Sequence, residues 1–392
     1  LPLLMERGYA DCPDMTQMTK KLARLYGADL TVDARPMGAN HNLCVSVTGI
    51  KDQFALEGEP LTQEYAELAL GTAFHPYFVG ETFDPEAVKI EKQMLKKALE
   101  DEVNEKRLYC QRQANREFFG DSPAGVRQEG YLEEVEGLTA RQLTDAYYEM
   151  LRAASIELIV LGCGEAQTEA VKNALLEELS QVERAPAALA ENMAMPRREP
   201  VRKVEHFDTT QAKLCMLFTT GEANPNPPSV SILRVAMSVL GGSATSRLFR
   251  NVREKQSLCY YCGSAAQRAT GVMMIDSGVE PGKEQQAEAA IIAELEGLKN
   301  GPITQEEVDD CRRGLLSSMD ALGDSLAALE NWYYGQITRG EPLYPPEYGK
   351  VLTSAVSLDE VRQTLQSYSY SVCYAVTAEP GTQGKGGSED VE

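Results

Sequence analysis

Hydrophobic positions in the first half of the chain follow helical and strand periods in turn. Residues 16–26 have apolar positions at helical spacing, and Gly27 follows as a natural C-cap. Residues 29–47 alternate and are interrupted at 35–38 by Arg-Pro-Met-Gly, which predicts a β-hairpin. The pattern further predicts helices over residues 60–70, 85 to about 107 (with Asp84 as N-cap and Pro85 at the first position), 116–119, 139–150 and 167–179, and a buried strand over 156–161.

The periodic pattern stops between residues 184 and 203, where Ala, Pro and mixed charges predominate, as is typical of a linker. Beyond it the pattern resumes. It predicts a strand over 213–218, a helix over 229–240, a hairpin over 258–278 broken near 267–271, helices over 304–316 and 358–366, and a strand over 370–377. The residues after Pro380 are rich in Gly, Ser and acidic side chains, and we expect them to be disordered.

Three sequence features recur in the same order in the two halves. Residues 84–88 resemble 304–308 at the start of a long helix, and residues 138–161 resemble 357–376 as a capped helix followed by an apolar strand. The hairpin after Gly27 is matched by the hairpin after Tyr260. This repetition predicts an α+β protein with two copies of one fold. We expect the domains to span residues 1–183 and 204–380, with a linker at 184–203 and a tail at 381–392.

Composition excludes some classes of function. A chain of 392 residues with 43% hydrophobic and 25% charged residues is long enough for two or three globular domains. Its net charge of −21 argues against nucleic-acid binding, and no apolar run is long enough for a membrane span. The nine cysteines are scattered, which favours a reducing cytoplasm. Cys259 and Cys262 are the nearest pair, but no second pair completes a zinc site.

Residues 240–261, LGGSATSRLFRNVREKQSLCYY, form the most informative segment. A small-residue turn comes first and contains Gly241, Gly242, Ser243 and Ser246. A basic helix and the start of a strand follow, and we expect Arg253 and Tyr260 to point outward where the two meet. A guanidinium and a phenol together suit a carbonyl or carboxylate oxygen. Alternatively, Arg253 serves only as a cation at a helix C-terminus and Tyr260 as a strand aromatic packed on a sheet.

This segment resembles the signature of the second half of M16 zinc peptidases, the family of insulinase, pitrilysin and the mitochondrial processing peptidase. In that family an Arg seven residues before a Tyr binds the substrate near the scissile bond, and Arg253 and Tyr260 occupy those positions. The resemblance covers most of the chain. It implies two homologous domains, each an antiparallel-rich sheet with helices packed on one face, as in bacterial M16 proteins that occur as paired subunits.

The catalytic half of the family carries HxxEH, in which two His bind zinc and the Glu is the general base. The histidines here are His41, His75 and His206, and no two have that spacing. If Gly8 is matched to the Gly after the family motif, Pro2 takes the place of the base and Leu3 that of the second His. The distal ligand falls at residues 96–98, Lys-Lys-Ala. The resemblance therefore implies an N-terminally short first domain without a metal site.

These residues lead to one principal interpretation. The resemblance implies a non-catalytic, substrate-binding subunit of a heterodimeric zinc peptidase, which supplies Arg253 and Tyr260 in trans to a partner with HxxEH and zinc. We expect a peptide substrate, a cytoplasmic location, no cofactor in this chain, and inactivity alone. Self-association is the other possible pairing. The alternative functions are a non-enzymatic M16-fold scaffold or peptide-binding protein, and a self-sufficient metallopeptidase with zinc outside the family positions.

Overall fold

The computed structural model describes residues 1–190, 194–221, 229–338 and 340–379. The chain divides into two compact units. Unit 1 comprises Leu1–Asp101 and Val126–Glu191, and unit 2 comprises Glu102–Gly125 and Asn192–Glu392. Both units combine helices and strands, and the predicted α+β class is confirmed. The expected tail at 381–392 lies outside the described residues.

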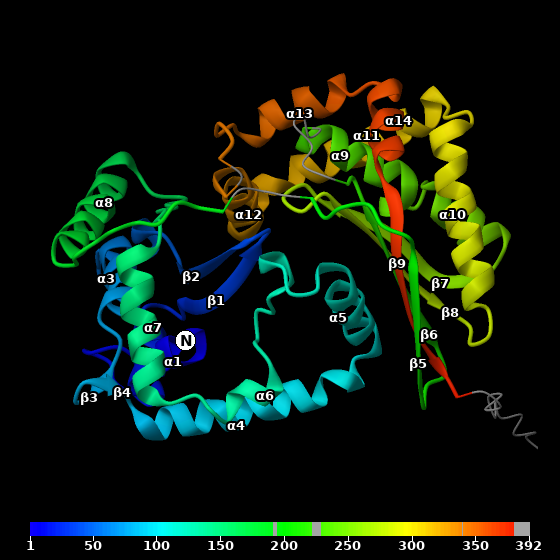
Figure 1. Ribbon diagram of the computed structural model, residues 1–392. Coiled ribbons are helices and arrows are strands. Elements are labelled where there is room, and N and C mark those ends of the chain that lie inside the picture. Colours follow the sequence, from blue (N-terminus) through cyan, green and yellow to red (C-terminus); the bar gives the residue numbers. More distant parts are fainter. Residues whose placement is uncertain (191–193, 222–228, 339, 380–392) are drawn as a thin grey trace, which may run out of the picture. The chain divides into compact units, whose positions relative to one another are not determined.

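Unit 1 is mainly helical around a two-stranded hairpin (Figure 1). Its elements are α1 (Pro2–Glu6), α2 (Met15–Arg24), β1 (Asp29–Met37), β2 (Asn40–Thr48), η1 (Asp52–Phe54), α3 (Leu61–Phe74), β3 (Phe78–Val79), β4 (Thr82–Phe83), α4 (Pro85–Asp101), α6 (Leu132–Val135), α7 (Ala140–Ala153) and α8 (Glu165–Ser180). The hairpin contributes Leu30 to one core with α2 and α3, and Val32 to a second core with α4 and α7. Side chains of alternating strand residues thus pack into two separate clusters.

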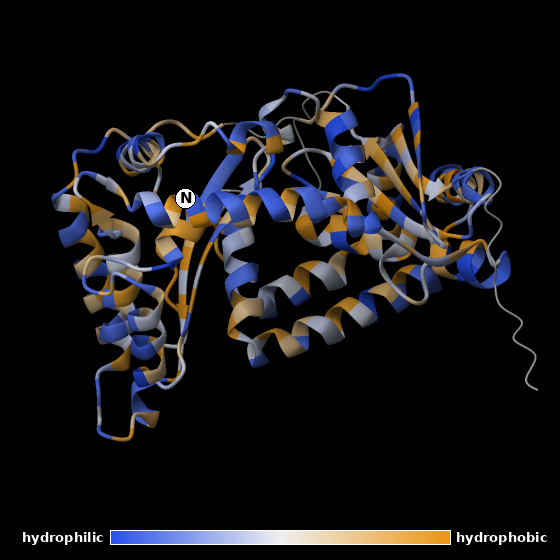
Figure 2. Ribbon diagram, turned by 90° about the horizontal axis from the view of Figure 1, so that it is seen from below, coloured by the Kyte–Doolittle hydropathy of each residue, from blue (hydrophilic) through white to orange (hydrophobic). Residues whose placement is uncertain are grey.

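Side chains cap the first turns of α2 and α7 in unit 1. Asp14 accepts a hydrogen bond from the backbone N–H of Gln17 at 2.9 Å, and Thr139 forms a capping box with Gln142. In Figure 2 helices carry hydrophobic residues on one side and hydrophilic residues on the other, as expected for helices that cover a core. The predicted long helix ends earlier than expected, because the 3₁₀ turn η2 (Glu102–Asn104) separates α4 from the next helix.

Unit 2 is built on a five-stranded sheet in the order β5-β9-β6-β8-β7. Its elements are η2, α5 (Lys106–Phe119), η3 (Pro123–Gly125), β5 (Val201–Phe207), β6 (Ala212–Thr219), α9 (Val230–Met237), η4 (Ser238–Gly242), η5 (Leu248–Lys255), β7 (Cys259–Gln267), β8 (Val272–Val279), α10 (Glu284–Asn300), α11 (Gln305–Asp320), η6 (Ala321–Asp324), α12 (Leu326–Ile337), α13 (Pro346–Ala355), α14 (Leu358–Ser367) and β9 (Ser369–Ala378). Strand β5 pairs with β9 in parallel, and the other pairings are antiparallel.

Helices cover both faces of this sheet. One face packs with α9, α10, α11 and α14 through residues such as Leu214 and Met216, whereas the other packs with α5 through Cys110 and Phe118 (Figure 1). At the same face Arg107 donates a hydrogen bond to the buried Asp276 at 2.5 Å. The expectation of helices on one face is therefore wrong for unit 2. Residues 102–125, expected in the first domain, instead belong to unit 2.

The predicted buried strand over residues 156–161 is wrong. These residues form neither helix nor strand, and Leu158 is 40% exposed. None of the described strands pairs with this segment, so its backbone groups have no ladder to join. The predicted hairpins over 29–47 and 258–278 are present as β1–β2 and β7–β8, and the final strand is β9.

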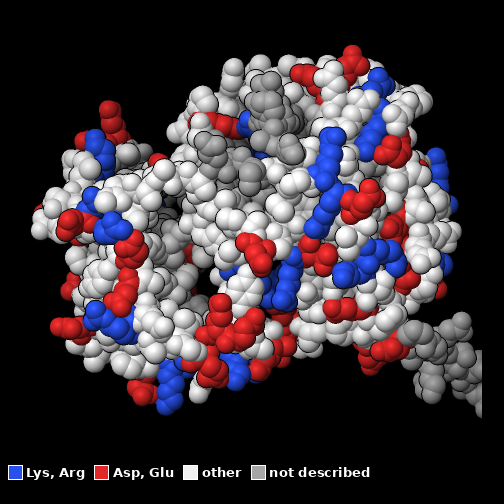
Figure 3. Space-filling view, in the orientation of Figure 1, with Lys and Arg blue, Asp and Glu red and all other residues white. Residues whose placement is uncertain are grey.

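Carboxylates and cations are interspersed on the face shown in Figure 3. In the part of the chain that the structure describes, no helix has the length and apolar character needed to cross a membrane.

Candidate functional site

The small-residue turn of residues 241–246 is a tightly packed support. A Cβ added to Gly241 would lie 2.8 Å from the backbone nitrogen of Ser264 and 2.9 Å from Leu248 Cδ1, and one on Gly242 would lie 3.1 Å from the Met237 carbonyl oxygen. Only glycine fits these approaches without displacing backbone.

The two serines of the turn serve the backbone around them. The Ser243 hydroxyl donates to the carbonyl of Ser238 at 3.2 Å. Ser246 is buried, and its hydroxyl accepts from the N–H of Phe249 at 3.4 Å at the start of η5. These contacts occupy the hydroxyls inside the protein, so the two serines position η5 rather than present groups to solvent.

Helix η5 is held against α11 by an ion pair that the sequence pattern did not reveal. Arg247 binds Glu307 through two nitrogens, with Nη2 2.9 Å from Oε2, and Arg250 reaches Oε1 at 3.1 Å. Burial acts to raise the pKa of Glu307, but hydrogen bonds from Arg247 and Thr304 prevail and lower the pKa to about 2. The capping-box spacing from Thr304 to Glu307 was the available signal for this carboxylate.

Arg253 and Tyr260 lie at the turn from η5 into β7, which we call the Arg253–Tyr260 corner. The Arg253 side chain is 41% exposed, with its guanidinium 4.6 Å from the Phe249 ring centre and 3.7 Å from Glu254. Tyr260 is 56% exposed, so it does not pack on the sheet. No direct bond joins the two side chains among the described residues. Both polar groups therefore face solvent and are available to a ligand.

The backbone of this corner is irregular in three ways. Helix η5 is a π-helix, Ser257 has a φ of +51°, and the β7–β8 register contains a bulge at Tyr260. Each is uncommon for a non-glycine segment, and such irregularities concentrate at functional sites because they aim particular side chains. At Tyr260 the bulge leaves the side chain exposed between two residues that are largely buried.

Known proteins with similar sequence or structure are M16 peptidases or their inactive relatives. The model of the Peptidase M16 inactive domain matches residues 137–315. The "Probable inactive metalloprotease YmfF" of Bacillus subtilis (strain 168) is 24% identical over 336 residues, which are 86% of this chain and 78% of that protein. The sequence and structure of this chain are therefore similar to those of M16 peptidases.

Solved structures agree with the M16 fold. A conserved protein from Enterococcus faecalis V583 has a TM-score of 0.82 at 24% identity, and the match covers 96% of this chain and 88% of that one. A peptidase M16 inactive domain from Pseudomonas fluorescens has a TM-score of 0.74 at 18% identity, covering 96% of this chain and 87% of the other. At these identities the structures bear on the fold alone.

With Gly8 matched to the Gly after the family motif, the residues that fall at the M16 zinc positions do not fit a metal. Pro2 and Leu3 offer no ligand or base, and Lys96 forms an ion pair with Glu136 at 2.9 Å. Among the described residues, no group of three or more His, Cys, Asp and Glu side chains could hold a metal ion. His75 pairs with Glu178 at 2.8 Å, and His206 bonds the carbonyl of Ala378 at 2.9 Å. We therefore derive no step through zinc in this chain.

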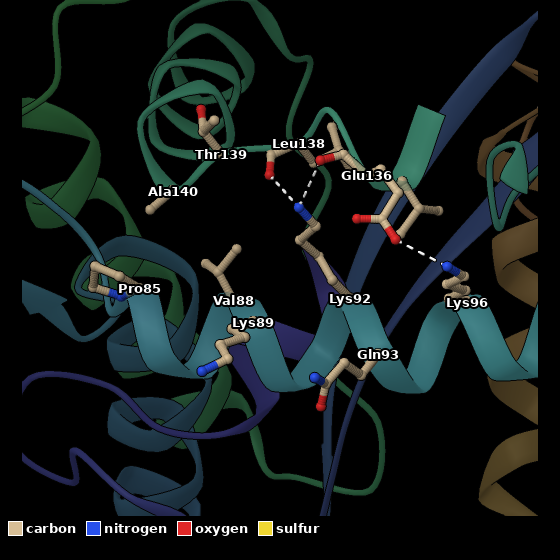
Figure 4. Close-up of a pocket in the computed structure, with 11 residues that line it drawn as sticks. Pro85, Val88, Lys89, Lys92, Gln93, Lys96, Glu136, Leu138, Thr139 and Ala140 are labelled. Atoms are coloured by element: carbon tan, nitrogen blue, oxygen red, sulfur yellow. Dashed lines mark hydrogen bonds and ion pairs between the residues drawn. The ribbon is translucent and has the colours of Figure 1, made fainter. Parts of the chain in front are cut away.

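A surface pocket of about 360 Å³ lies beside α4, the helix that carries Lys96 (Figure 4). Lysines of α4 hold its two sides together. Lys92 donates to the carbonyls of Glu136 at 2.9 Å and Leu138 at 2.8 Å, and Lys96 reaches the Glu136 carboxylate. These bonds join α4 to the connection between α6 and α7. They occupy the ammonium groups of Lys92 and Lys96 within the fold.

Proposed function

We propose that this chain is the non-catalytic, substrate-binding subunit of a heterodimeric M16-type zinc peptidase. The observation that carries the proposal is a contrast between two sites. The exposed Arg253–Tyr260 corner keeps the substrate-binding residue types of the family, whereas Pro2, Leu3 and Lys96 stand at the zinc positions. A chain with one half of a site is useful when a partner with HxxEH supplies the other half.

The chemistry of the corner suits a peptide carbonyl. Arg253 presents a permanently charged guanidinium with several N–H donors, and Tyr260 presents a phenolic O–H. Placed beside the scissile bond, both would donate hydrogen bonds to the carbonyl oxygen and stabilise the negative charge that develops on it. The partly buried Arg247–Glu307 pair supports this role because it fixes η5, the helix that carries Arg253.

Two further observations are consistent with the proposal. The similarity to a protein named as a probable inactive metalloprotease supports a non-catalytic role. All nine cysteines are free thiols, which supports a reducing, cytoplasmic location.

A reconstitution experiment tests the proposal. The chain is assayed for peptide hydrolysis alone and after mixing with an HxxEH-bearing M16 homologue, and we expect activity only in the mixture. Arg253→Ala should lower kcat/KM of the mixture by about a hundredfold, the usual effect of removing one oxyanion donor. Arg253→Lys should restore only part of the activity, because an ammonium cannot reproduce the planar guanidinium.

Arg313→Ala is the matched control, because Arg313 is an exposed arginine of the same unit that pairs with Asp310 on its own helix. We expect it to leave activity unchanged, and size-exclusion chromatography should show equal assembly of all variants. Full activity of the Arg253→Ala mixture would contradict the in-trans role. Peptide binding by an assembled pair that cleaves nothing would favour a non-enzymatic scaffold instead.

A further inference from the structure

We propose that Cys259 and Cys262 form a reversible intramolecular disulfide, so that β7 carries a redox modification site beside the Arg253–Tyr260 corner. The two residues enclose Tyr260 and Tyr261 in a Cys-x-x-Cys sequence. Spacing of this kind is typical of redox-active dithiols when it occurs in a suitable local structure. In this chain the spacing falls within β7, where a β-bulge separates the two cysteines.

The β-bulge brings both thiols to the same face of the sheet. In a regular strand, residues three apart point to opposite faces. Here Cys259 pairs with Val279 and Tyr261 with Gly278, so Tyr260 is an extra residue that changes the alternation. Cys259 and Cys262 are 9% and 8% exposed, and both belong to the core on the face that packs with α9, α10, α11 and α14.

The contacts of Tyr261, one of the two residues between the cysteines, show which face of the sheet it occupies. The Tyr261 hydroxyl donates to Asp276 at 3.4 Å, and its ring lies 4.6 Å from the guanidinium of Arg107, on α5. Tyr261 thus points to the opposite face from the two thiols. The cysteines are neighbours on one face although two residues separate them along the chain.

The surroundings give the two thiols different roles. A hydrogen bond with Cys262 lowers the pKa of Cys259, burial opposes this, and the positive charge of Arg253 lowers the pKa further. The same hydrogen bond, together with burial, raises the pKa of Cys262. Cys259 also begins β7 at the exposed Arg253–Tyr260 corner, so we assign it the role of nucleophile and Cys262 that of the thiol that resolves the intermediate.

Hydrogen peroxide is the oxidant we assign, because it is small enough to reach a thiol with little exposed surface. The Cys259 thiolate attacks one peroxide oxygen, the O–O bond breaks, and the departing hydroxide takes a proton to become water. Cys262 then attacks the sulfenic sulfur and displaces the second oxygen as water. Two thiols lose two protons and two electrons, and one peroxide becomes two water molecules.

Disulfide formation would act on the neighbouring binding site. The new S–S bond closes a short ring that contains Tyr260, and disulfide geometry requires the two Cα atoms to lie within about 7 Å. The bond would therefore restrict the backbone on both sides of the exposed phenol. This effect on peptide binding rests on the proposed function, whereas the disulfide itself does not.

Peptide mass spectrometry of the chain alone tests the disulfide. Cys163 is the exposed cysteine, so Cys163→Ser provides the background. Trypsin releases residues 256–268, a peptide whose only cysteines are Cys259 and Cys262. After peroxide treatment we expect this peptide to lose two hydrogen atoms and to recover them with dithiothreitol. Its oxidation should be at least about tenfold faster than that of the buried Cys215.

Single variants separate the two roles. Cys262→Ser should stop at a Cys259 sulfenic acid that dimedone labels, and Cys259→Ser should yield neither this label nor a disulfide. Circular dichroism before and after oxidation ensures that the folded protein is measured. A 256–268 peptide that keeps both thiols, or oxidises no faster than Cys215, would overturn the proposal. Because no partner is present, this result is independent of the peptidase role.

Discussion

The two halves of the chain contain the same helix-then-apolar-segment pattern, but only one half turns it into a strand. In unit 1, α7 is followed by residues 156–161, which are irregular and partly exposed. In unit 2, α14 is followed by β9, which lies between β5 and β6 and is almost entirely buried. Both helices begin with the same capping box.

This difference shows that an apolar segment becomes a strand through its neighbours. Strand β9 has hydrogen-bonding partners on both edges, and side chains such as Val372 and Ala375 pack on the two faces of the sheet. Residues 156–161 have no described strand on either edge. The pattern of apolar residues indicates where a strand can form, whereas tertiary pairing decides whether it does.

The largest expected effect comes from a charge placed in each apolar segment. Val372→Asp would bury an unpaired carboxylate in the centre of the unit 2 sheet and should cost at least about 4 kcal/mol of unfolding free energy. Leu158→Asp, at a 40% exposed position, should change it by no more than about 0.5 kcal/mol. Urea denaturation followed by circular dichroism measures both.

Val372→Ala provides a milder version if the aspartate variant does not fold, and should cost about 2 kcal/mol through the lost packing. Equal sensitivity at positions 158 and 372 would break the comparison. It would mean that residues 156–161 are structured in solution as firmly as β9.

A smaller effect is expected where the long helices of the repeat begin. In unit 1, Asp84 accepts a hydrogen bond from the N–H of Glu86 at 3.0 Å. In unit 2, Glu307 near the start of α11 closes the capping box with Thr304 and also binds Arg247. Arg247→Ala leaves this carboxylate with only the more exposed Arg250 and should cost about 2 kcal/mol, between the values for exposed and buried pairs. Asp84→Ala should cost about 1 kcal/mol.

Lowering the pH tests the contribution of Glu307 to the stability of unit 2. The folded pKa of Glu307 is about 2, below its ordinary value of 4.5, so its contribution is complete above pH 4.5 and is lost as the pH falls towards 2. The stability difference between the wild type and Glu307→Gln should therefore shrink over that interval. Denaturation at several pH values measures it. A difference that is constant with pH would show that the carboxylate is not held by Arg247.

Patterns of residues close together in the sequence predicted much of the fold. Contacts between residues far apart in the chain were missed. The capped helices that follow Thr139 and Ser357, and both hairpins, follow from residues close in sequence. The packing of α5 on the unit 2 sheet depends on contacts such as Arg107 to Asp276, which are far apart in the chain. At the candidate site, the glycine turn was predictable. The bulge that aligns the two cysteines was not, because one inserted residue reverses the strand alternation.

The smallest expected effect tests whether the two capping boxes are equivalent. Thr139 and Ser357 each accept a hydrogen bond at 3.2 Å from the N–H three residues on, of Gln142 and Glu360 respectively. Mutation of either cap to Ala should cost about 1 kcal/mol at neutral pH. Hydrogen bonds from the backbone N–H and the hydroxyl of Ser357 lower the pKa of Glu360. The stabilisation of α14 by the Glu360 carboxylate is therefore complete above the ordinary pKa of 4.5 and declines in acid.

Gln142 does not titrate, so the two caps should respond differently to pH. Ser357→Ala removes the hydroxyl that donates to Glu360 Oε2 at 2.7 Å, so its cost should decrease below pH 4.5 as the carboxylate is protonated, whereas that of Thr139→Ala should stay constant. Glu360→Gln should make the α14 cap behave like the α7 cap. If the two costs instead fell together in acid, the titrating group would lie elsewhere. Equal costs at neutral pH would mean that the contrast between β9 and residues 156–161 arises after the helix, from the strands available to pair.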